Sequence, residues 1–317
     1  MTSNVRIGTR GSELALWQTN HVKALLEERF PDIVVELQII KTTGDKILDA
    51  PLAKIGDKGL FTKELEAALS DERIDLAVHS FKDVPTAIPE GLAIGAVLKR
   101  EDVRDVFIGH PKSSNYLFTT LPHNAVIATG SLRRKCQVLN ARQDIQIVDI
   151  RGNLNTRIKK LDESNWDGMI LAQAGVTRLG WAQRITEILP FEIMLPAVGQ
   201  GALAVEIREG DKRIEDLVRT LHHLPTALTV NAERSLLRHL EGGCQIPLGA
   251  YGHIAGSELQ LDAVIGSLDG KRIVKGSRSG NQTDAERIGI ELAEELLKRG
   301  GKEILDEIRN TTSPWPF

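Results

Sequence analysis

The sequence predicts an α/β protein with two lobes, followed by a smaller α+β module. In the first half of the chain, short apolar runs alternate with helical patterns. This alternation is typical of a mainly parallel sheet with helices on both faces. It restarts after the charged stretch 98–105, which is a candidate hinge, and the last third departs from it. A chain of 317 residues is also long for one compact core, which favours two or three domains.

The first lobe is expected to begin with a buried strand at 5–9 and a helix from about Ser12. Ser12 is suited to cap this helix, whose apolar residues fall near one face. Further strands are expected at 33–40 and 74–80, with a helix at 63–72. Residues 42–61 contain three glycines and have no clean period. Loops this long are usually functional or disordered, and we expect a mobile lid rather than a passive loop.

The second lobe repeats the pattern, and the final module changes it. The expected elements of the second lobe are strands at 125–130, 145–150 and 168–176, the last closing in a turn, and helices at 131–142 and 155–163. The apolar, glycine-rich stretch 195–207 is a candidate second crossing between the lobes. The expected elements of the last module are a helix at 226–242, strands at 259–267 and 272–280, and a helix at 284–300.

The composition argues against several classes of protein. Aromatic residues make up only 4% of the chain and the formal net charge is −3, so binding to DNA or RNA is not expected. The N-terminus lacks the pattern of a signal peptide, and no apolar run approaches the ~18–20 residues that span a bilayer. Two cysteines without a CxxC motif support neither a disulfide framework nor a metal site. We expect a soluble, cytoplasmic protein.

Basic residues gather where predicted strands end and helices begin. A helix N-terminus already carries about half a positive charge, so a cation there is unfavourable unless an anion completes the site. In an open α/β sheet, ligands bind at the carboxyl ends of the strands. Arginine favours flat targets such as carboxylate or phosphate, and no phosphate-binding loop is present. The pattern predicts an anion cleft, with a solvated basic face as the alternative; its arginines are Arg10, Arg133, Arg134, Arg151 and Arg157.

Asp83 stands in HSFKDVP, directly after Lys82. In a basic cleft this carboxylate would be ionised, and could stabilise a cation on an anionic substrate or move a proton. An ordinary aspartate at a turn explains the residue equally well. For His79, the preferred interpretation is a core histidine at the end of the strand.

The two cysteines have different surroundings. Cys136 falls within a predicted helix, where packing explains it. Cys244, in EGGCQIPLGA, follows a helix end and precedes Pro247, so its thiol is expected to be accessible. No Cys–His spacing indicates a protease-type nucleophile. An anchor for a covalent group therefore fits Cys244 better than a turnover nucleophile, while simple packing stays open.

Seven stretches in order resemble the porphobilinogen deaminase (hydroxymethylbilane synthase) family. They run from about residue 5 to 250: RIGTRGSELALWQ, GDKGLFTKELE, AVHSFKDVPT, TGSLRRKCQ, IRGNLNTR, LPAVGQGALAVE and LEGGCQIPLGA. One departure is Gly130, where the family more often has serine, and little consequence is expected.

The resemblance implies a three-domain fold with two lobes like those of periplasmic binding proteins, joined by a double crossover. The implied bounds are 1–98 with 200–219 for the first lobe, 103–196 for the second, and 222–317 for the α+β domain that carries the cysteine. It also implies a monomeric transferase of tetrapyrrole and heme biosynthesis. Four porphobilinogen units are condensed with loss of ammonia, and hydrolysis releases hydroxymethylbilane.

The resemblance further assigns roles to residues. It implies a dipyrromethane cofactor attached to Cys244 through a thioether, and Asp83 as the catalytic carboxylate. The implied cofactor-binding residues are Lys82, Asp83, Thr129, Ser131, Arg133 and Arg134. The implied substrate-binding residues are Arg10, Ser12, Lys54, Lys58, Arg151, Arg157 and Arg178. Rival readings are a non-catalytic, two-lobe anion-binding protein and a phosphate-handling enzyme.

Overall fold

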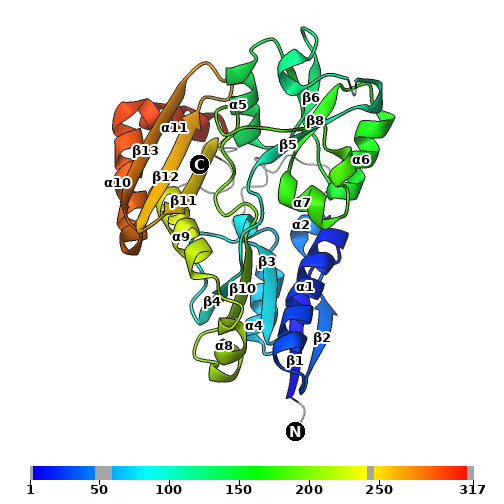
Figure 1. The fold of residues 1–317 in the computed structure, drawn as a ribbon, viewed down its shortest axis with the longest axis vertical. Helices are drawn as coiled ribbons and strands as arrows, with labels where there is room; N and C mark the ends of the chain where they lie inside the picture. Colours follow the sequence, from blue (N-terminus) through cyan, green and yellow to red (C-terminus); the bar gives the residue numbers. More distant parts are fainter. Residues whose placement is uncertain (1–2, 47–58, 114, 241–245, 313–317) are drawn as a thin grey trace. The chain divides into compact units, whose positions relative to one another are not determined.

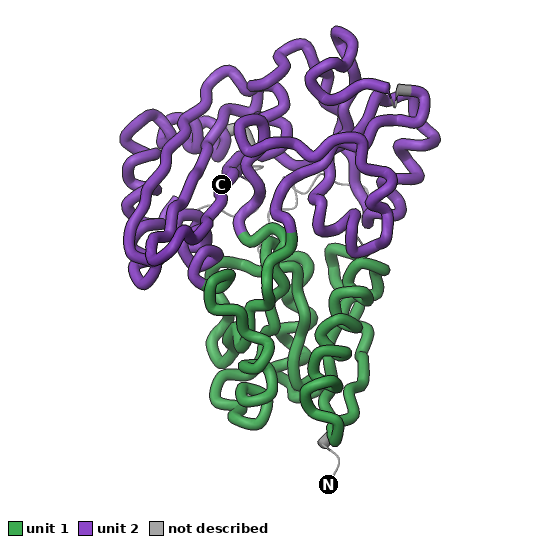
Figure 2. Tube along the Cα trace, in the orientation of Figure 1, with its two compact units in different colours: residues 1–48, 57–101, 199–227 green, residues 49–56, 102–198, 228–317 purple. Residues whose placement is uncertain are grey.

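The structure is a computed structural model that describes residues 3–46, 59–113, 115–240 and 246–312. The chain divides into two compact units (Figure 2). Unit 1 comprises the described residues of 3–46, 59–101 and 199–227, and unit 2 comprises those of 102–198 and 228–312. The chain therefore enters unit 2, returns to unit 1 near residue 199 and leaves it again near residue 228.

Unit 1 is built on a five-stranded sheet in the order β2-β1-β3-β10-β4 (Figure 1). Strand β1 pairs parallel with β2 and β3, while β10 runs antiparallel between β3 and β4. The strands are β1 (Ser3–Thr9), β2 (Ile33–Ile39), β3 (Leu76–Ser80), β4 (Leu92–Val97) and β10 (Leu203–Arg208). The helices are α1 (Glu13–Arg29), α2 (Thr43–Lys46), α4 (Lys63–Ser70), η1 (Phe81–Asp83) and α8 (Lys212–Arg219).

Two clusters of buried apolar side chains include residues of this sheet, one with α1 and α8 and one with α4. Val5 and Ile7 of β1 are fully buried with Val22 and Leu26 of α1. Helix α1 begins where the sequence predicts, because the Ser12 hydroxyl accepts a hydrogen bond from the Ala15 amide at 3.3 Å. The start of this helix is thereby fixed directly after the end of β1.

Unit 2 contains a second five-stranded sheet, in the order β7-β6-β8-β5-β9. Strand β6 pairs parallel with β7 and β8, and β5 runs antiparallel to β8 and β9. The strands are β5 (Asp105–Gly109), β6 (Val126–Ala128), β7 (Gln146–Val148), β8 (Gly168–Ala172) and β9 (Glu187–Ile188). The helices are η2 (Pro111–Ser113), η3 (Phe118–Thr120), α5 (Leu132–Ala141), α6 (Leu154–Glu163), α7 (Gln173–Arg178) and η4 (Ala182–Arg184).

The last part of the chain forms a three-stranded antiparallel sheet in the order β11-β12-β13. Helices α10 and α11 cover one face of it (Figure 1), and their buried leucines and isoleucines join those of the strands in one core. The elements are α9 (Leu224–His239), β11 (Leu248–Ala255), β12 (Glu258–Gly266), β13 (Ile273–Asn281), η5 (Gln282–Asp284), α10 (Ala285–Leu296), η6 (Leu297–Gly301) and α11 (Lys302–Thr312).

The predicted fold class is confirmed: two α/β lobes and a small α+β domain. In each lobe sheet, one antiparallel strand occupies the fourth position, so the sheets are mixed within a mainly parallel frame. The three-domain boundaries stay a prediction.

Some local expectations were wrong. Residue 105 belongs to β5 rather than to a hinge, and α7 rather than a turn follows β8. The helix predicted to end at residue 300 does break there, at Gly300 with φ 103°, but the further helix α11 was not predicted; its Ile304, Leu305 and Ile308 return the chain to the core.

Candidate functional site

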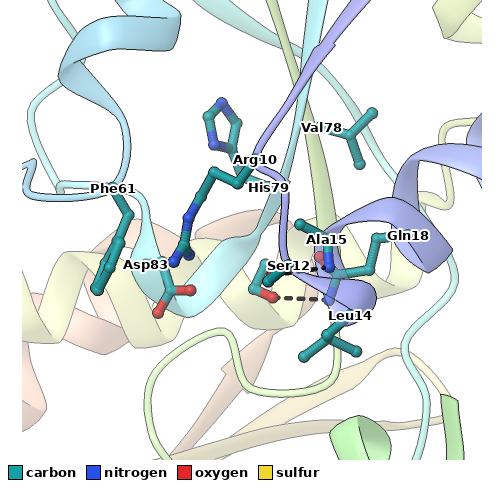
Figure 3. A pocket seen from close by; sticks show the side chains of 10 residues that line it. Arg10, Ser12, Leu14, Ala15, Gln18, Phe61, Val78, His79 and Asp83 are labelled. Atoms are coloured by element: carbon teal, nitrogen blue, oxygen red, sulfur yellow. Dashed lines mark hydrogen bonds between the residues drawn. The ribbon is translucent and has the colours of Figure 1, made fainter. Parts of the chain in front are cut away.

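Unit 1 contains a pocket at the edge where β1 and β3 end (Figure 3). The two strands are parallel, so their carboxyl ends lie on the same edge of the sheet. The pocket is lined by Arg10, Ser12, Leu14, Ala15, Gln18, Phe61, Val78, His79, Ser80 and Asp83. The structure thus brings together three residues that the sequence predicted for the site, Arg10, Ser12 and Asp83.

Asp83 is held by a short turn after β3. The turn is anchored by Phe81, which is buried and whose amide donates to the carbonyl of Ala202 at 3.0 Å. Phe61 and Arg10 line the same pocket as Asp83. Lys82 and Asp83 follow on this turn and are half-buried. An apolar anchor therefore presents the carboxylate at the rim of the sheet.

Arg10 already binds a carboxylate of its own chain. Its Nη2 lies 2.5 Å from Oδ1 of Asp45, and its Nε lies 3.2 and 3.3 Å from the two Asp45 oxygens. The guanidinium carbon also lies 4.0 Å from the centroid of the Phe61 ring, a cation–π contact. Burial acts to raise the pKa of Asp45, but the hydrogen bonds and the charge of Arg10, together with the hydrogen bonds from Thr42, outweigh burial and lower this pKa.

A buried histidine–glutamate contact lies at the wall of the pocket. Nε2 of His79 is 3.0 Å from Oε2 of Glu206 on β10, and both side chains are buried. His79 is buried, as expected of a core histidine, yet it also lines the pocket. Burial raises the pKa of nearby Glu66, and the charge of Glu206 raises it further. The amide of Gln18 donates to the Ser80 hydroxyl at 2.8 Å, tying α1 to the end of β3.

In unit 2, the ends of β6 and β7 lie side by side. The Thr129 amide donates to the Val148 carbonyl at 2.9 Å, and the Ser131 hydroxyl caps α5 by accepting from the Arg134 amide. A Cβ at Gly130 would lie 2.7 Å from the carbonyl oxygen of Ile150. A serine at this position therefore requires the neighbouring backbone to shift, so the departure at Gly130 has a structural consequence that the sequence did not reveal.

Arg133 and Arg134 both bind Asp105, the first residue of β5. Arg133 Nη1 lies 2.6 Å from Oδ2, and Arg134 Nη2 lies 2.8 Å from Oδ1. Arg133 also donates to the carbonyl of Leu195, and Arg134 to that of Ile170. Burial acts to raise the pKa of Asp105, but the charges of the two arginines prevail and lower it to about 2. The side chains are 5% and 7% exposed for the arginines and 0% for the aspartate.

The remaining predicted arginines of unit 2 follow the neighbouring strands. Arg151 lies between β7 and α6, where burial lowers its pKa. Arg157 on α6 donates through Nε to the Gly152 carbonyl at 2.9 Å. Arg178 ends α7 and is buried. Cys244, Lys54 and Lys58 lie outside the described residues, and so do residues 47–58 of the expected lid. The site roles of all these residues stay predictions.

Several residues at these sites were missed by sequence reasoning. Asp45 ends TTGD, just after the second strand, and this position was a usable signal for a carboxylate at the same sheet edge. Asp105 begins the apolar run DVFIG, but its charge was assigned to a hinge. Glu206 carried no signal, because it is a single acidic residue in a strand far along the chain.

Cys136 is buried on α5, and burial raises the pKa of its thiol to about 12, which agrees with a packing role. Within the described ranges, no group of three or more histidine, cysteine, aspartate or glutamate side chains is arranged to hold a metal ion. None of the helices in the described part of the chain has the length and apolar character that crossing a membrane requires.

The fold is an α/β architecture with basic residues directly after sheet strands, Arg10 after β1 and Arg151 in the connection that follows β7. The family model "Porphobilinogen deaminase, dipyromethane cofactor binding domain" matches residues 5–216, and "Porphobilinogen deaminase, C-terminal domain" matches residues 227–298. The chain belongs to the porphobilinogen deaminase family, as its sequence motifs predicted.

Relatives named porphobilinogen deaminase match nearly the whole chain. The one from Chlorobium phaeobacteroides (strain BS1) is 53% identical over 315 residues, covering 98% of this chain and 100% of the relative. The one from Carboxydothermus hydrogenoformans is 53% identical over 309 residues, covering 98% of each. Among solved structures, the BvgS VFT2 domain of Bordetella pertussis matches with a TM-score of 0.42 and 14% identity, covering 69% of this chain and 86% of that domain.

Proposed function

We propose that this chain condenses four porphobilinogen units with loss of ammonia and releases hydroxymethylbilane by hydrolysis. The observation that carries the proposal is the pocket of unit 1, where Arg10 and Asp83 meet. Porphobilinogen bears an acetate and a propionate, which need a cationic fork. Its reaction develops positive charge as ammonia leaves, which needs a carboxylate. One pocket supplies both requirements, and membership in the porphobilinogen deaminase family supports the same reaction.

The described residues fit a carboxylate-rich dipyrromethane. Nε of Arg133 and Nη1 of Arg151 are buried N–H groups without a hydrogen-bond partner among the described residues. A buried donor is costly to leave unpaired, so an anion that reaches these groups is stabilised. Ser131 caps α5, the helix that carries Arg133, and its amide donates to the Thr129 hydroxyl. When bound through Cys244, the dipyrromethane supplies the pyrrole carbon to which each new unit is joined.

Each predicted site residue has a separate role in this reaction. Asp83 stabilises positive charge on the reacting pyrrole, and Arg10 with Ser12 binds the carboxylates of the incoming unit. Lys82 shares the turn of Asp83 and contributes to holding the cofactor. Arg134 supports the cofactor site through Asp105 and helix α5. The growing oligopyrrole is bound by the remaining basic residues, which are Lys54, Lys58, Arg151, Arg157 and Arg178.

Further properties belong to the same proposal. The enzyme acts as a cytoplasmic monomer on a small-molecule substrate, in three domains, and binds no nucleic acid. The net charge of −3 supports the last point, since polyanions are repelled by the surface as a whole while the local basic sites attract small anions.

The catalytic role of Asp83 can be tested by replacing it with alanine. Removing one preorganised charge is expected to lower kcat by about 100- to 1,000-fold. Asp83→Ala should retain the thermal unfolding midpoint of the wild type, because the residue lies at a pocket rim. Asp71→Ala, at an exposed aspartate of the same unit, is the matched control and should retain full activity. Near-normal turnover by Asp83→Ala would remove the residue from its role.

The cofactor can be tested by the intact mass of the purified protein. We expect the wild type to be heavier than its sequence by two linked pyrrole units, and Cys244→Ser to carry no such addition. A wild type with the mass of its sequence alone, and no turnover of porphobilinogen, would instead favour a non-catalytic anion-binding protein.

A further inference from the structure

The carboxylate fork of Arg10 is occupied by an aspartate of its own chain. Asp45 receives hydrogen bonds from both Nε and Nη2 of Arg10, which is the two-point geometry that a substrate carboxylate would use. One face of the guanidinium is stacked on Phe61. Asp45 therefore takes the place at Arg10 that the proposed function assigns to the substrate.

Asp45 is held in position by its surroundings. The hydroxyl of Thr42, a fully buried residue, donates to Oδ2 of Asp45 at 2.7 Å, and the Thr42 amide donates to the same oxygen at 3.4 Å. The α2 turn that carries Asp45 is fastened by the Gly44 amide, which donates to the Leu60 carbonyl at 2.9 Å. Thr43 also donates through its amide and hydroxyl to Glu64. The aspartate is thus preorganised for Arg10.

Glycine is required in this turn by its close approach to Phe61. A Cβ at Gly44 would lie 2.2 Å from a carbon of the Phe61 ring, closer than any real contact. The turn therefore packs directly on the ring that stacks against Arg10. Asp45, Phe61 and Arg10 form one assembly, which we call the Arg10 clamp.

Both partners of the Arg10–Asp45 ion pair are partly exposed, so another carboxylate can replace that of Asp45. The Arg10 side chain is 22% exposed and that of Asp45 is 29% exposed, so water reaches both partners. Pairs near the surface contribute about 0–1 kcal/mol, because solvent screens them and competes for the same groups. A carboxylate that arrives from solution can therefore replace Asp45 without leaving a buried charge unpaired.

We propose that Asp45 is an internal competitor for the Arg10 fork, which a carboxylate of porphobilinogen must displace. This inference rests on the proposed function and adds a determinant of substrate affinity and selectivity to it. A ligand without a carboxylate cannot displace Asp45, so the clamp disfavours neutral pyrroles. Asp45 acts through Arg10 and is a positioning residue, and it takes no part in the bond changes.

The proposal predicts an effect opposite to that of an ordinary supporting residue. Loss of a support raises KM, because the binding group becomes disordered. Loss of a competitor lowers KM, because the apparent affinity rises with the fraction of sites that are free to bind. The sign of the change in KM therefore separates the two roles.

The test is the steady-state kinetics of Asp45→Asn with porphobilinogen. KM should fall by about 2- to 5-fold, which is the release of about 0.4–1 kcal/mol of competition, while kcat changes by less than about twofold. Thr42→Val removes the hydroxyl that orients Asp45 at nearly constant volume, and should lower KM by a smaller factor. Asp71→Asn is the control and should leave KM unchanged. An unchanged or raised KM in Asp45→Asn would overturn the proposal.

A second measurement needs no turnover. The rate at which phenylglyoxal labels Arg10, followed by peptide mass spectrometry, should rise in Asp45→Asn, and the succinate concentration that half-protects Arg10 should fall. Equal labelling and equal protection in variant and wild type would overturn the competition. If the wild type fails to turn over porphobilinogen, the proposed function is refuted, whereas the succinate protection still decides whether Asp45 competes for Arg10.

Discussion

Two aspartates hold predicted ligand-binding arginines, and they do so at different depths. In unit 2, Asp105 is 0% exposed and binds Arg133 and Arg134, which are 5% and 7% exposed. In unit 1, Asp45 binds Arg10, and their side chains are 29% and 22% exposed. An aspartate–arginine ion pair therefore has a different role in each unit. The buried group joins β5 to α5, whereas the partly exposed pair is able to exchange.

The difference also decides how a ligand can use these arginines. Breaking a buried pair leaves a charge in a medium that solvates it poorly, so Arg133 and Arg134 stay on Asp105 and offer a ligand only their remaining N–H groups. Nε of Arg133 is such a group within the described structure. Arg10, in contrast, can offer its whole fork once Asp45 is displaced. The N–H groups that unit 2 offers a ligand are therefore constant, whereas the affinity of Arg10 for a ligand carboxylate depends on how strongly Asp45 competes.

The largest expected effect is on stability, from Asp105→Asn. The substitution leaves two buried guanidinium groups without their anion, and should lower the free energy of unfolding by about 3–5 kcal/mol. Urea unfolding followed by circular dichroism measures it. Asp102→Asn is the control in the same unit, because the Asp102–Arg104 pair is 32% and 37% exposed and should contribute less than about 1 kcal/mol. Equal losses in the two variants would contradict a special role for the buried group.

An intermediate effect is expected on the pH dependence of stability. The pKa of Asp105 is lowered from 3.8 to about 2, so its unfolded form binds more protons at intermediate pH. Its contribution is fully present above about pH 4 and is lost as the pH falls through about 2, a change of about 2 kcal/mol. The free energy of unfolding of Asp105→Asn should therefore vary less between pH 4 and pH 2 than that of the wild type. Parallel curves would show that Asp105 does not contribute this term.

The smallest effect is expected from Asp45→Asn on stability. The pair with Arg10 is partly exposed, so the free energy of unfolding should fall by less than about 1 kcal/mol, even though KM changes. Urea unfolding in low and high salt measures the contribution, and added salt should reduce it further. A loss of 3 kcal/mol or more, similar to that of Asp105→Asn, would erase the contrast between the two sites.

Much of the fold followed from the sequence, because its signals are local. Apolar runs and helical periods located many elements, which are β1, α1, β2, α4, β3, β6, α5, β7, α6, β8, α9, β12, β13 and α10. The strands that were missed, such as β4 and β5, lie beside charged or glycine-containing segments where the period is unclear. Helix α11, which follows the break at Gly300, was also missed, since only its packing into the core shows that the chain continues as a helix.

The sequence by itself predicted Arg10, Ser12 and Asp83 as site residues, and the structure places all three at one pocket, where the parallel strands β1 and β3 end. Only the tertiary structure decided which partners these residues and their neighbours have. Arg10 meets Asp45 across 35 positions, Arg134 meets Asp105 across 29, and His79 meets Glu206 across 127. Such pairs depend on how distant segments pack, and a local pattern of residue types carries no information about packing at that range.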